Sequence, residues 1–138
     1  MIQRLPGWPE AFASALSHVQ NKPFEWGVND CCLFACNCVL AITGTDLART
    51  FRGYQNRKEA IALIASYGGL YQLAAAIGKE HGIPEISALK ARRGDVVLFE
   101  GGNGPALGIC TGDKIAAPGD TGLIGYPIRD ALHAWRIG

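Results

Sequence analysis

Hydrophobic and polar positions in the first eighty residues predict four helices. Apolar residues recur at helical spacing in three of the segments, whereas the second segment is apolar on nearly every side, which is typical of a buried helix. Asn56 is a suitable cap for the third helix and Gly68 a suitable stop, and we expect Ile61, Leu63 and Ile64 of that helix to face inward. The expected ranges are 8–20, 31–43, 57–67 and about 70–80, with a short helical or irregular link at 46–54.

The character of the chain changes near residue 88, where short apolar runs alternate with turn-forming residues. A charged turn at 89–95 is expected to lead into the first strand of a small antiparallel sheet. The strands expected from this pattern cover residues 96–99, 106–110, 115–117, 122–124 and 134–137. Helices followed by strands, without repeats or a linker, predict the α+β class and a single domain over residues 1–138.

The second helix contains the residues with the clearest chemical potential. Asp30 is a good N-cap, because its side chain can accept hydrogen bonds from the first free backbone N–H groups of a helix. Cys31 then falls on the first turn, where the helix dipole favours negative charge and should lower the pKa of a thiol. Gly44 is expected to end the helix in a left-handed conformation. The pattern therefore places a thiol at the dipole-positive end of a buried helix.

The composition and charge of the chain limit the kinds of partner that we expect. The chain has 138 residues, a formal net charge of +1 and 49% hydrophobic residues, which favours a globular domain over disorder. This charge balance gives no reason to expect nucleic acid or an anionic membrane as a partner. No apolar run reaches the roughly 18–20 residues of a membrane span, and the N-terminus lacks the apolar core of a signal peptide. We therefore expect synthesis in the cytoplasm, where thiols stay reduced.

Five cysteines are present, and four of them fall on the second helix. We expect free thiols that serve mainly as small apolar core residues. On a helical wheel Cys31 and Cys38 share one face, and Cys32 and Cys36 share another, so the four cannot close around one zinc ion. A metal site shared with a neighbouring subunit stays open as an alternative, and Cys110 is expected in the core. The sequence implies no metal ligand within one chain and no cofactor.

An ordered set of motifs resembles a known enzyme family. Trp26-Gly27, Asp30-Cys31 and the segment 94–99 resemble the NlpC-type cell-wall peptidases of the papain-like superfamily, over roughly residues 23–117. More narrowly, the segments 29–34, 106–109 and 134–137 resemble a small family encoded in tailed-phage genomes, whose members usually lie among tail-tip genes. The resemblance implies a papain-like fold, in which N-terminal helices and a central cysteine-bearing helix pack on a small C-terminal sheet.

The resemblance also implies roles for individual residues. Cys31 matches the nucleophile and Asp30 the helix cap beside it, as the catalytic pair. Trp26 and Gly27 match part of the substrate groove, and Asn29 a neighbour of the oxyanion. The catalytic histidine of the family, however, aligns with Ala106. Without an imidazole, proton transfer to the leaving amine, typically worth about 10²–10⁴-fold in rate, has no agent.

Three histidines lie elsewhere in the sequence. His133 precedes the last expected strand and is the candidate substitute base, provided that this strand borders the sheet near Cys31. His81 falls at the C-terminal end of a helix, where the dipole alone favours a charged imidazole. His18 is expected on the surface of the first helix. Since a base must lie within about 3 Å of its partner, we do not expect any of them to replace the missing histidine.

Three functional hypotheses follow. The first is a structural component of a phage tail tip or baseplate, located in the virion and assembled in the host cytoplasm, with a degenerate peptidase site. Its partners would be other tail-tip proteins, such as hub, distal tail or fibre-attachment proteins. The second is an active cysteine peptidase or amidase that cleaves peptidoglycan stem peptides during phage entry. The third is a cysteine-rich, metal-binding tail module.

Overall fold

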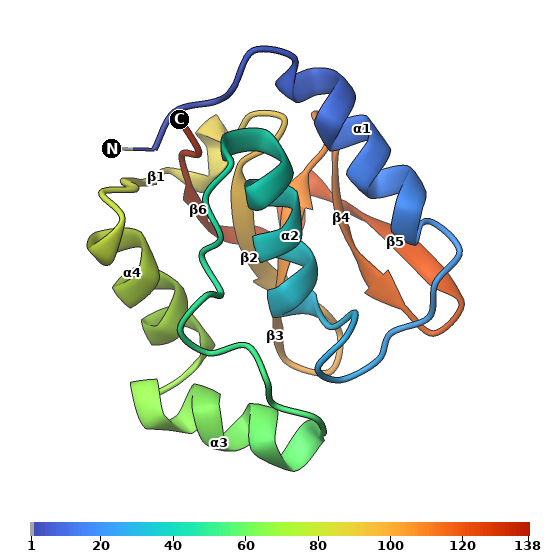
Figure 1. The fold of residues 1–138 in the computed structure, drawn as a ribbon, viewed down its shortest axis with the longest axis vertical. Coiled ribbons are helices and arrows are strands. Elements are labelled where there is room, and N and C mark those ends of the chain that lie inside the picture. The colour runs from blue at the N-terminus through green and yellow to red at the C-terminus, as the bar shows by residue number, and fades with distance from the viewer. Residues whose placement is uncertain (1) are drawn as a thin grey trace.

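A computed structural model describes residues 2–138, in which four helices precede a six-stranded antiparallel sheet (Figure 1). The α+β prediction is confirmed. The helices are α1 (Trp8–Val19), α2 (Cys31–Thr43), α3 (Arg57–Tyr67) and α4 (Leu70–Glu80). The strands are β1 (Glu85–Ile86), β2 (Val96–Glu100), β3 (Pro105–Cys110), β4 (Lys114–Gly119), β5 (Gly122–Pro127) and β6 (Ala131–Trp135).

Local capping signals explain why the helix boundaries agree so well with the sequence prediction. The Asp30 carboxylate accepts the backbone N–H of Leu33 at the start of α2, and the Asn56 side chain accepts that of Glu59 at the start of α3. Gly44 and Gly68 end these two helices in the left-handed conformation, with φ of 78° and 99°. Both helices are therefore bounded by residues directly next to them in the sequence.

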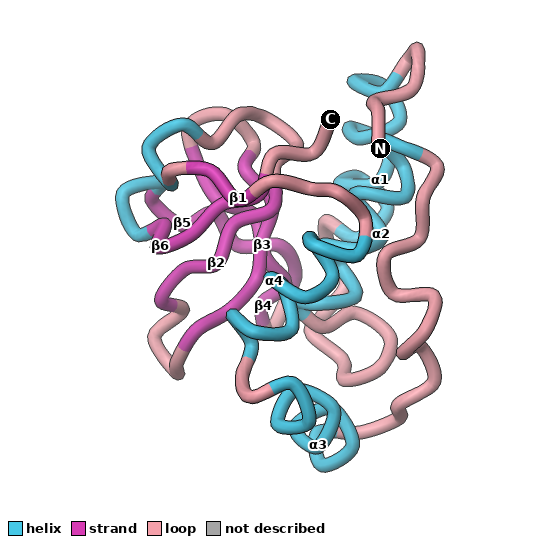
Figure 2. The backbone as a smooth tube through the Cα atoms, turned by 90° about the vertical axis from the view of Figure 1, so that its left-hand side faces the viewer, coloured by secondary structure: helices cyan, strands magenta, loops and turns pink. Residues whose placement is uncertain are grey.

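The sheet has the strand order β1-β6-β2-β3-β4-β5, and every neighbouring pair is antiparallel. Strands β2 to β5 follow one another along the chain, whereas β6 returns across the sheet to lie between β1 and β2. Val97 pairs with Gly108 of β3 on one side and with Ala134 of β6 on the other. Figure 2 shows the strands gathered on one side of the molecule and helices α1 to α4 on the other.

The two faces of the sheet bury separate hydrophobic clusters. Side chains alternate between the faces along each strand, so Leu107 and Ile109 of β3 face the α2 side while Cys110 faces away. The larger cluster, on the α2 side, also includes Phe34 and Val39 of that helix. Helix α2 thus lies between α1 and the sheet, as its nearly uniform apolar character predicts.

Helices α3 and α4 follow each other at an angle and lie beside the start of α2 (Figure 1). Leu63 and Ile64 of α3 pack against the larger cluster, as expected. The prediction for Ile61 is wrong, since this side chain is 43% exposed on the outer surface of α3. Within residues 2–138 no single helix is long and apolar enough to cross a membrane, although α3 and α4 together, with a 66° bend, reach that length and composition.

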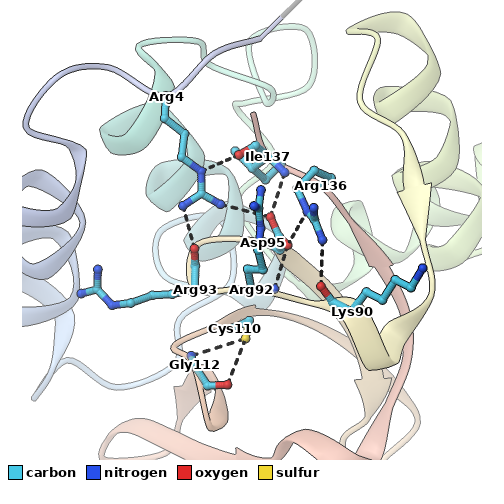
Figure 3. A network of polar contacts seen from close by, with 9 residues as sticks. All are labelled: Arg4, Lys90, Arg92, Arg93, Asp95, Cys110, Gly112, Arg136 and Ile137. Atoms are coloured by element: carbon cyan, nitrogen blue, oxygen red, sulfur yellow. Dashed lines mark hydrogen bonds and ion pairs between the residues drawn. The ribbon is translucent and has the colours of Figure 1, made fainter.

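A buried carboxylate joins both ends of the chain to the sheet (Figure 3). Asp95, immediately before β2, is fully buried and accepts hydrogen bonds from the guanidinium groups of Arg4, at 3.2 Å, and Arg136, at 3.0 Å. It also accepts the backbone N–H groups of Arg92 and Ile137. Because the carboxylate is paired and hydrogen-bonded on both oxygens, its burial is compensated.

Candidate functional site

A tight loop presents the start of α2. The backbones of Glu25 and Asn29 form an isolated antiparallel bridge, and the N–H of Val28 also donates to the carbonyl of Glu25. The rings of Phe24 and Trp26 meet edge to face with their centroids 4.8 Å apart. Together these contacts give the aromatic–glycine loop a fixed shape directly before the helix.

The Asp30 side chain is the centre of this arrangement and is only 1% exposed. One carboxylate oxygen accepts the N–H of Leu33, as a helix cap. The other accepts the N–H of Gly27 at 2.9 Å and the hydroxyl of Tyr54 at 2.6 Å. Burial, together with the hydrogen bond to Asp30, raises the pKa of the Tyr54 hydroxyl, so that this group stays a proton donor. Asp30 therefore holds the loop, the helix and the 46–54 link together.

Position 27 requires glycine because the loop there approaches the backbone of the 46–54 link closely. Its φ is 78°, in the region that favours glycine, and a Cβ at this position would collide with the carbonyl oxygen of Tyr54. The Trp-Gly motif thus has a packing reason here that is independent of any substrate.

Cys31 is the first residue of α2, as predicted, but burial outweighs the expected effect of the helix terminus on its thiol. Burial raises the pKa of Cys31 to about 12, and the charges of Cys32 and Asp30 act in the same direction. A hydrogen bond from the Leu107 backbone opposes this rise without cancelling it. The thiol is therefore protonated at neutral pH, because loss of solvent outweighs the attraction of the helix terminus.

A cavity of about 90 Å³ lies beside this thiol. It is bounded by the start of α2, by helices α3 and α4 and by the start of β3. Its polar side chains come from Asp30 and Tyr54, which already bond to each other, and from the two thiols. The lining residues are Trp26, Asp30, Cys31, Cys32, Tyr54, Ala60, Leu63, Ile64, Leu70, Leu73 and Pro105. No imidazole is among them.

The three histidines are each engaged elsewhere. His133 lies in β6, two strands from β3 and hence about 10 Å across the sheet, and its Nδ1 is 2.9 Å from the Glu85 carboxylate. His81 follows the last turn of α4 as its C-terminal cap. His18 is exposed on α1 with its Nε2 3.2 Å from Lys22 Nζ. The structure thus does not bring His133, the candidate base, to the cavity of Cys31.

Ala106, which aligns with the catalytic histidine of the peptidases, lies on the face of the sheet that points away from α2. Ala106 pairs with Phe99 of β2 and packs with the cluster on the face of the sheet away from α2. The β3 residue whose backbone reaches Cys31 is its neighbour Leu107, whose side chain belongs to the α2-side cluster. Neither residue can accept a proton from a thiol.

The predicted substrate-binding residues separate into two groups. Trp26 lines the cavity beside Cys31, where the resemblance places it. Asn29 does not, because its side chain is 5% exposed and its amide nitrogen donates to the carbonyl oxygen of Pro23 at 3.1 Å. The Asn29 side chain thus fixes the loop at residues 22–23, outside the lining of the cavity, and its place beside an oxyanion stays a prediction.

Comparison with protein families places the whole chain in one group. The model of a domain family of unknown function, DUF6950, matches residues 3–137. The chain belongs to this family. No curated protein matches the sequence.

The remaining cysteines of this DUF6950 domain are buried and free. Cys32 hydrogen-bonds to Cys36 one turn on, and this contact and burial raise the pKa of Cys32. Burial likewise raises the pKa of Cys38 to about 12. Within residues 2–138 no three His, Cys, Asp or Glu side chains are grouped to hold a metal ion, so nothing there supports the metal-binding hypothesis.

Sequence reasoning missed Tyr54, which contributes both a wall of the cavity and the hydrogen bond to Asp30. Tyr54 lies in the irregular link, 24 positions from Asp30. Neither periodicity nor spacing carries a signal for such a contact. The closure of the site by α3 and α4 is missed for the same reason, since it depends on how these two helices pack beside the start of α2.

Proposed function

We propose that this chain is a papain-like scaffold of the NlpC type that no longer acts as a peptidase and serves as a structural component of a phage tail tip. The observation that carries the proposal is the setting of Cys31. Its thiol pKa is raised to about 12, its cavity is lined by no imidazole, and a hydrogen bond from the Leu107 backbone does not cancel this rise. A thiol in this state is a poor nucleophile, and the cavity has no imidazole to take the thiol proton and pass it to a leaving amine.

The retained features support a scaffold role. Asp30, Gly27 and Tyr54 are held by hydrogen bonds and close packing that stabilise the loop, the helix start and the link, whether or not a substrate ever binds. These contacts give a structural reason for the motif that resembles the peptidases. In this proposal the partners are neighbouring tail-tip proteins, and the protein is a virion component assembled in the host cytoplasm.

Gene deletion and complementation in a phage that encodes this chain test the proposal. Deletion should abolish assembly of infective tails, and both the wild-type chain and Cys31→Ala should restore it. Restoration by the wild-type chain but not by a folded Cys31→Ala variant would contradict the scaffold role. Normal tails without any copy of the chain would contradict it as well.

The cavity beside Cys31 favours one competing function, an active peptidoglycan peptidase or amidase. About 90 Å³ of space next to the thiol, with Trp26 in its wall, would suit an apolar side chain of a stem peptide. Purified protein incubated with peptidoglycan decides between the two. Release of muropeptides by the wild type and none by Cys31→Ser would establish the enzyme, whereas the scaffold proposal predicts no release from either.

A further inference from the structure

One end of the molecule concentrates positive charge. Five cationic residues lie near the buried carboxylate of Asp95. Arg4, Arg92 and Arg136 donate hydrogen bonds to it, whereas Lys90 and Arg93 take part through their backbone carbonyl oxygens and point their side chains away (Figure 3). The whole chain carries a formal charge of only +1, so the remainder of the molecule is net negative. The cationic excess is thus local, and a local field of one sign attracts a partner of the opposite sign.

The cations at this end differ in how far they are neutralised. Arg4 and Arg136 form ion pairs with Asp95, and their side chains are 13% and 25% exposed. The side chains of Lys90 and Arg92 are exposed and make no hydrogen bond or ion pair within residues 2–138. Besides burial, the charges of Arg92 and Arg136 lower the pKa of Arg4, which indicates that these cations repel one another.

An amphipathic groove adjoins these cations. It has a volume of about 530 Å³ and lies between the two chain ends and the turn after α4. Ile2, Ile83 and Pro84 give it apolar walls, while Lys79 and Arg136 supply the charge. Arg136 also donates to the carbonyl oxygen of Lys90, which connects the groove to the exposed cations.

Beside Lys90, the side chain of Leu89 is 95% exposed. A large apolar side chain directly next to unpaired cations is suited to a partner that offers both carboxylates and apolar groups. We define the basic surface as Lys79, Lys90, Arg92 and Arg136 with this groove and Leu89.

We propose that the basic surface docks an acidic peptide segment of another tail protein, with carboxylates on the cations and an apolar side chain in the groove. Nucleic acid fits less well. The groove walls are apolar, and none of the residues that line the groove is aromatic, so it offers no ring on which a base can stack. The identity of the partner as a tail protein rests on the proposed function, whereas the binding chemistry does not.

Fluorescence anisotropy with labelled probes tests the proposal. The probes are a short peptide of Asp, Glu and Leu, the same peptide with Lys in place of the acids, and a single-stranded oligonucleotide of similar length. The acidic peptide should bind most tightly, and its binding should weaken as NaCl is raised, because exposed charges are screened beyond about 10 Å at 0.1 M salt. Equal binding of the acidic and basic peptides, or no effect of salt, would overturn the proposal.

Two double variants with the same change in net charge test whether the acidic peptide binds at the basic surface. Lys90→Glu combined with Arg92→Glu should weaken binding of the acidic peptide by at least about tenfold, since attraction becomes repulsion. The control, Arg57→Glu combined with Lys58→Glu, makes the same change in net charge on exposed residues of α3 and should alter binding by less than about twofold.

Three results would count against the docking proposal in this comparison. These are equal losses in both double variants, no loss in either, and tighter binding of the oligonucleotide through the same two residues. Cys31→Ala should bind the acidic peptide as the wild type does. The outcome is therefore separate from the test of tail assembly, and either proposal can fail without the other.

Discussion

At the scale of single residues, Cys31 shows how the surroundings of a motif decide its chemistry. A helix terminus typically stabilises a nearby negative charge by about 0.3–1 kcal/mol, which is less than one pKa unit. Burial moves the pKa of this thiol from 9.0 to about 12 and therefore dominates. The Asp-Cys pair could be read from the sequence, but the apolar walls around it come from segments far along the chain.

Removal of the Tyr54 hydroxyl tests the role of Asp30 as a structural centre. Tyr54→Phe deletes the donor 2.6 Å from the buried carboxylate, and we expect the free energy of unfolding to fall by about 1–3 kcal/mol. Urea denaturation of the variant measures this loss. Tyr67→Phe, on an exposed tyrosine of α3, is the control and should change little. Equal stability of Tyr54→Phe and the wild type would show that Asp30 does not need this partner.

At the scale of elements, the sequence predicts best what is determined locally. The bounds of α2 and α3 follow from Asp30, Gly44, Asn56 and Gly68, all of which act within a few residues of the helix end. The two-residue strand β1 has no such signal and exists only through its pairing with β6. The insertion of β6 between β1 and β2 is equally non-local and could not be inferred from alternation.

The loop before α2 can be tested with two glycines that have the same φ angle. Gly27 and Gly7 both have φ of 78°, but only at Gly27 would a Cβ collide, with the Tyr54 carbonyl. Gly27→Ala should therefore destabilise the fold by at least about 1 kcal/mol more than Gly7→Ala, which carries the cost of the φ angle alone. Thermal unfolding of the two variants measures the difference. Equal losses would mean that the close approach of the loop to residue 54 is unimportant.

At the scale of the whole molecule, Asp95 closes the fold by joining both chain ends to β2. The sequence shows Gly94-Asp95 before a strand but does not indicate that Arg4 and Arg136, from opposite ends, meet on this carboxylate. The same limit applies to the candidate site. Its cysteine, cap and loop could be predicted, whereas Tyr54, the cover formed by α3 and α4, and the placement of His133 beside Glu85 could not.

Replacing the Asp95 carboxylate by a neutral amide should strongly lower the free energy of unfolding. Asp95→Asn leaves two guanidinium groups without their counter-charge in a mostly buried setting, and breaking such a pair typically costs about 3–5 kcal/mol. We expect a large fall in the denaturation midpoint. The exposed Asp113→Asn makes the same chemical change and should be nearly neutral. Similar denaturation midpoints for both variants would show that the Asp95 carboxylate is not needed to join the chain ends.

The pH dependence of Cys31 alkylation tests the central claim most directly, with iodoacetamide as reagent and peptide mass spectrometry to resolve the five cysteines. A thiol with a pKa of about 12 in an apolar cavity should react far more slowly than free cysteine at pH 7.5, and its rate should still be rising above pH 10. Alkylation at pH 7.5 that is faster than that of free cysteine, with a plateau below pH 8, would instead reveal an activated nucleophile. That result would contradict the proposal that this site no longer acts as a peptidase.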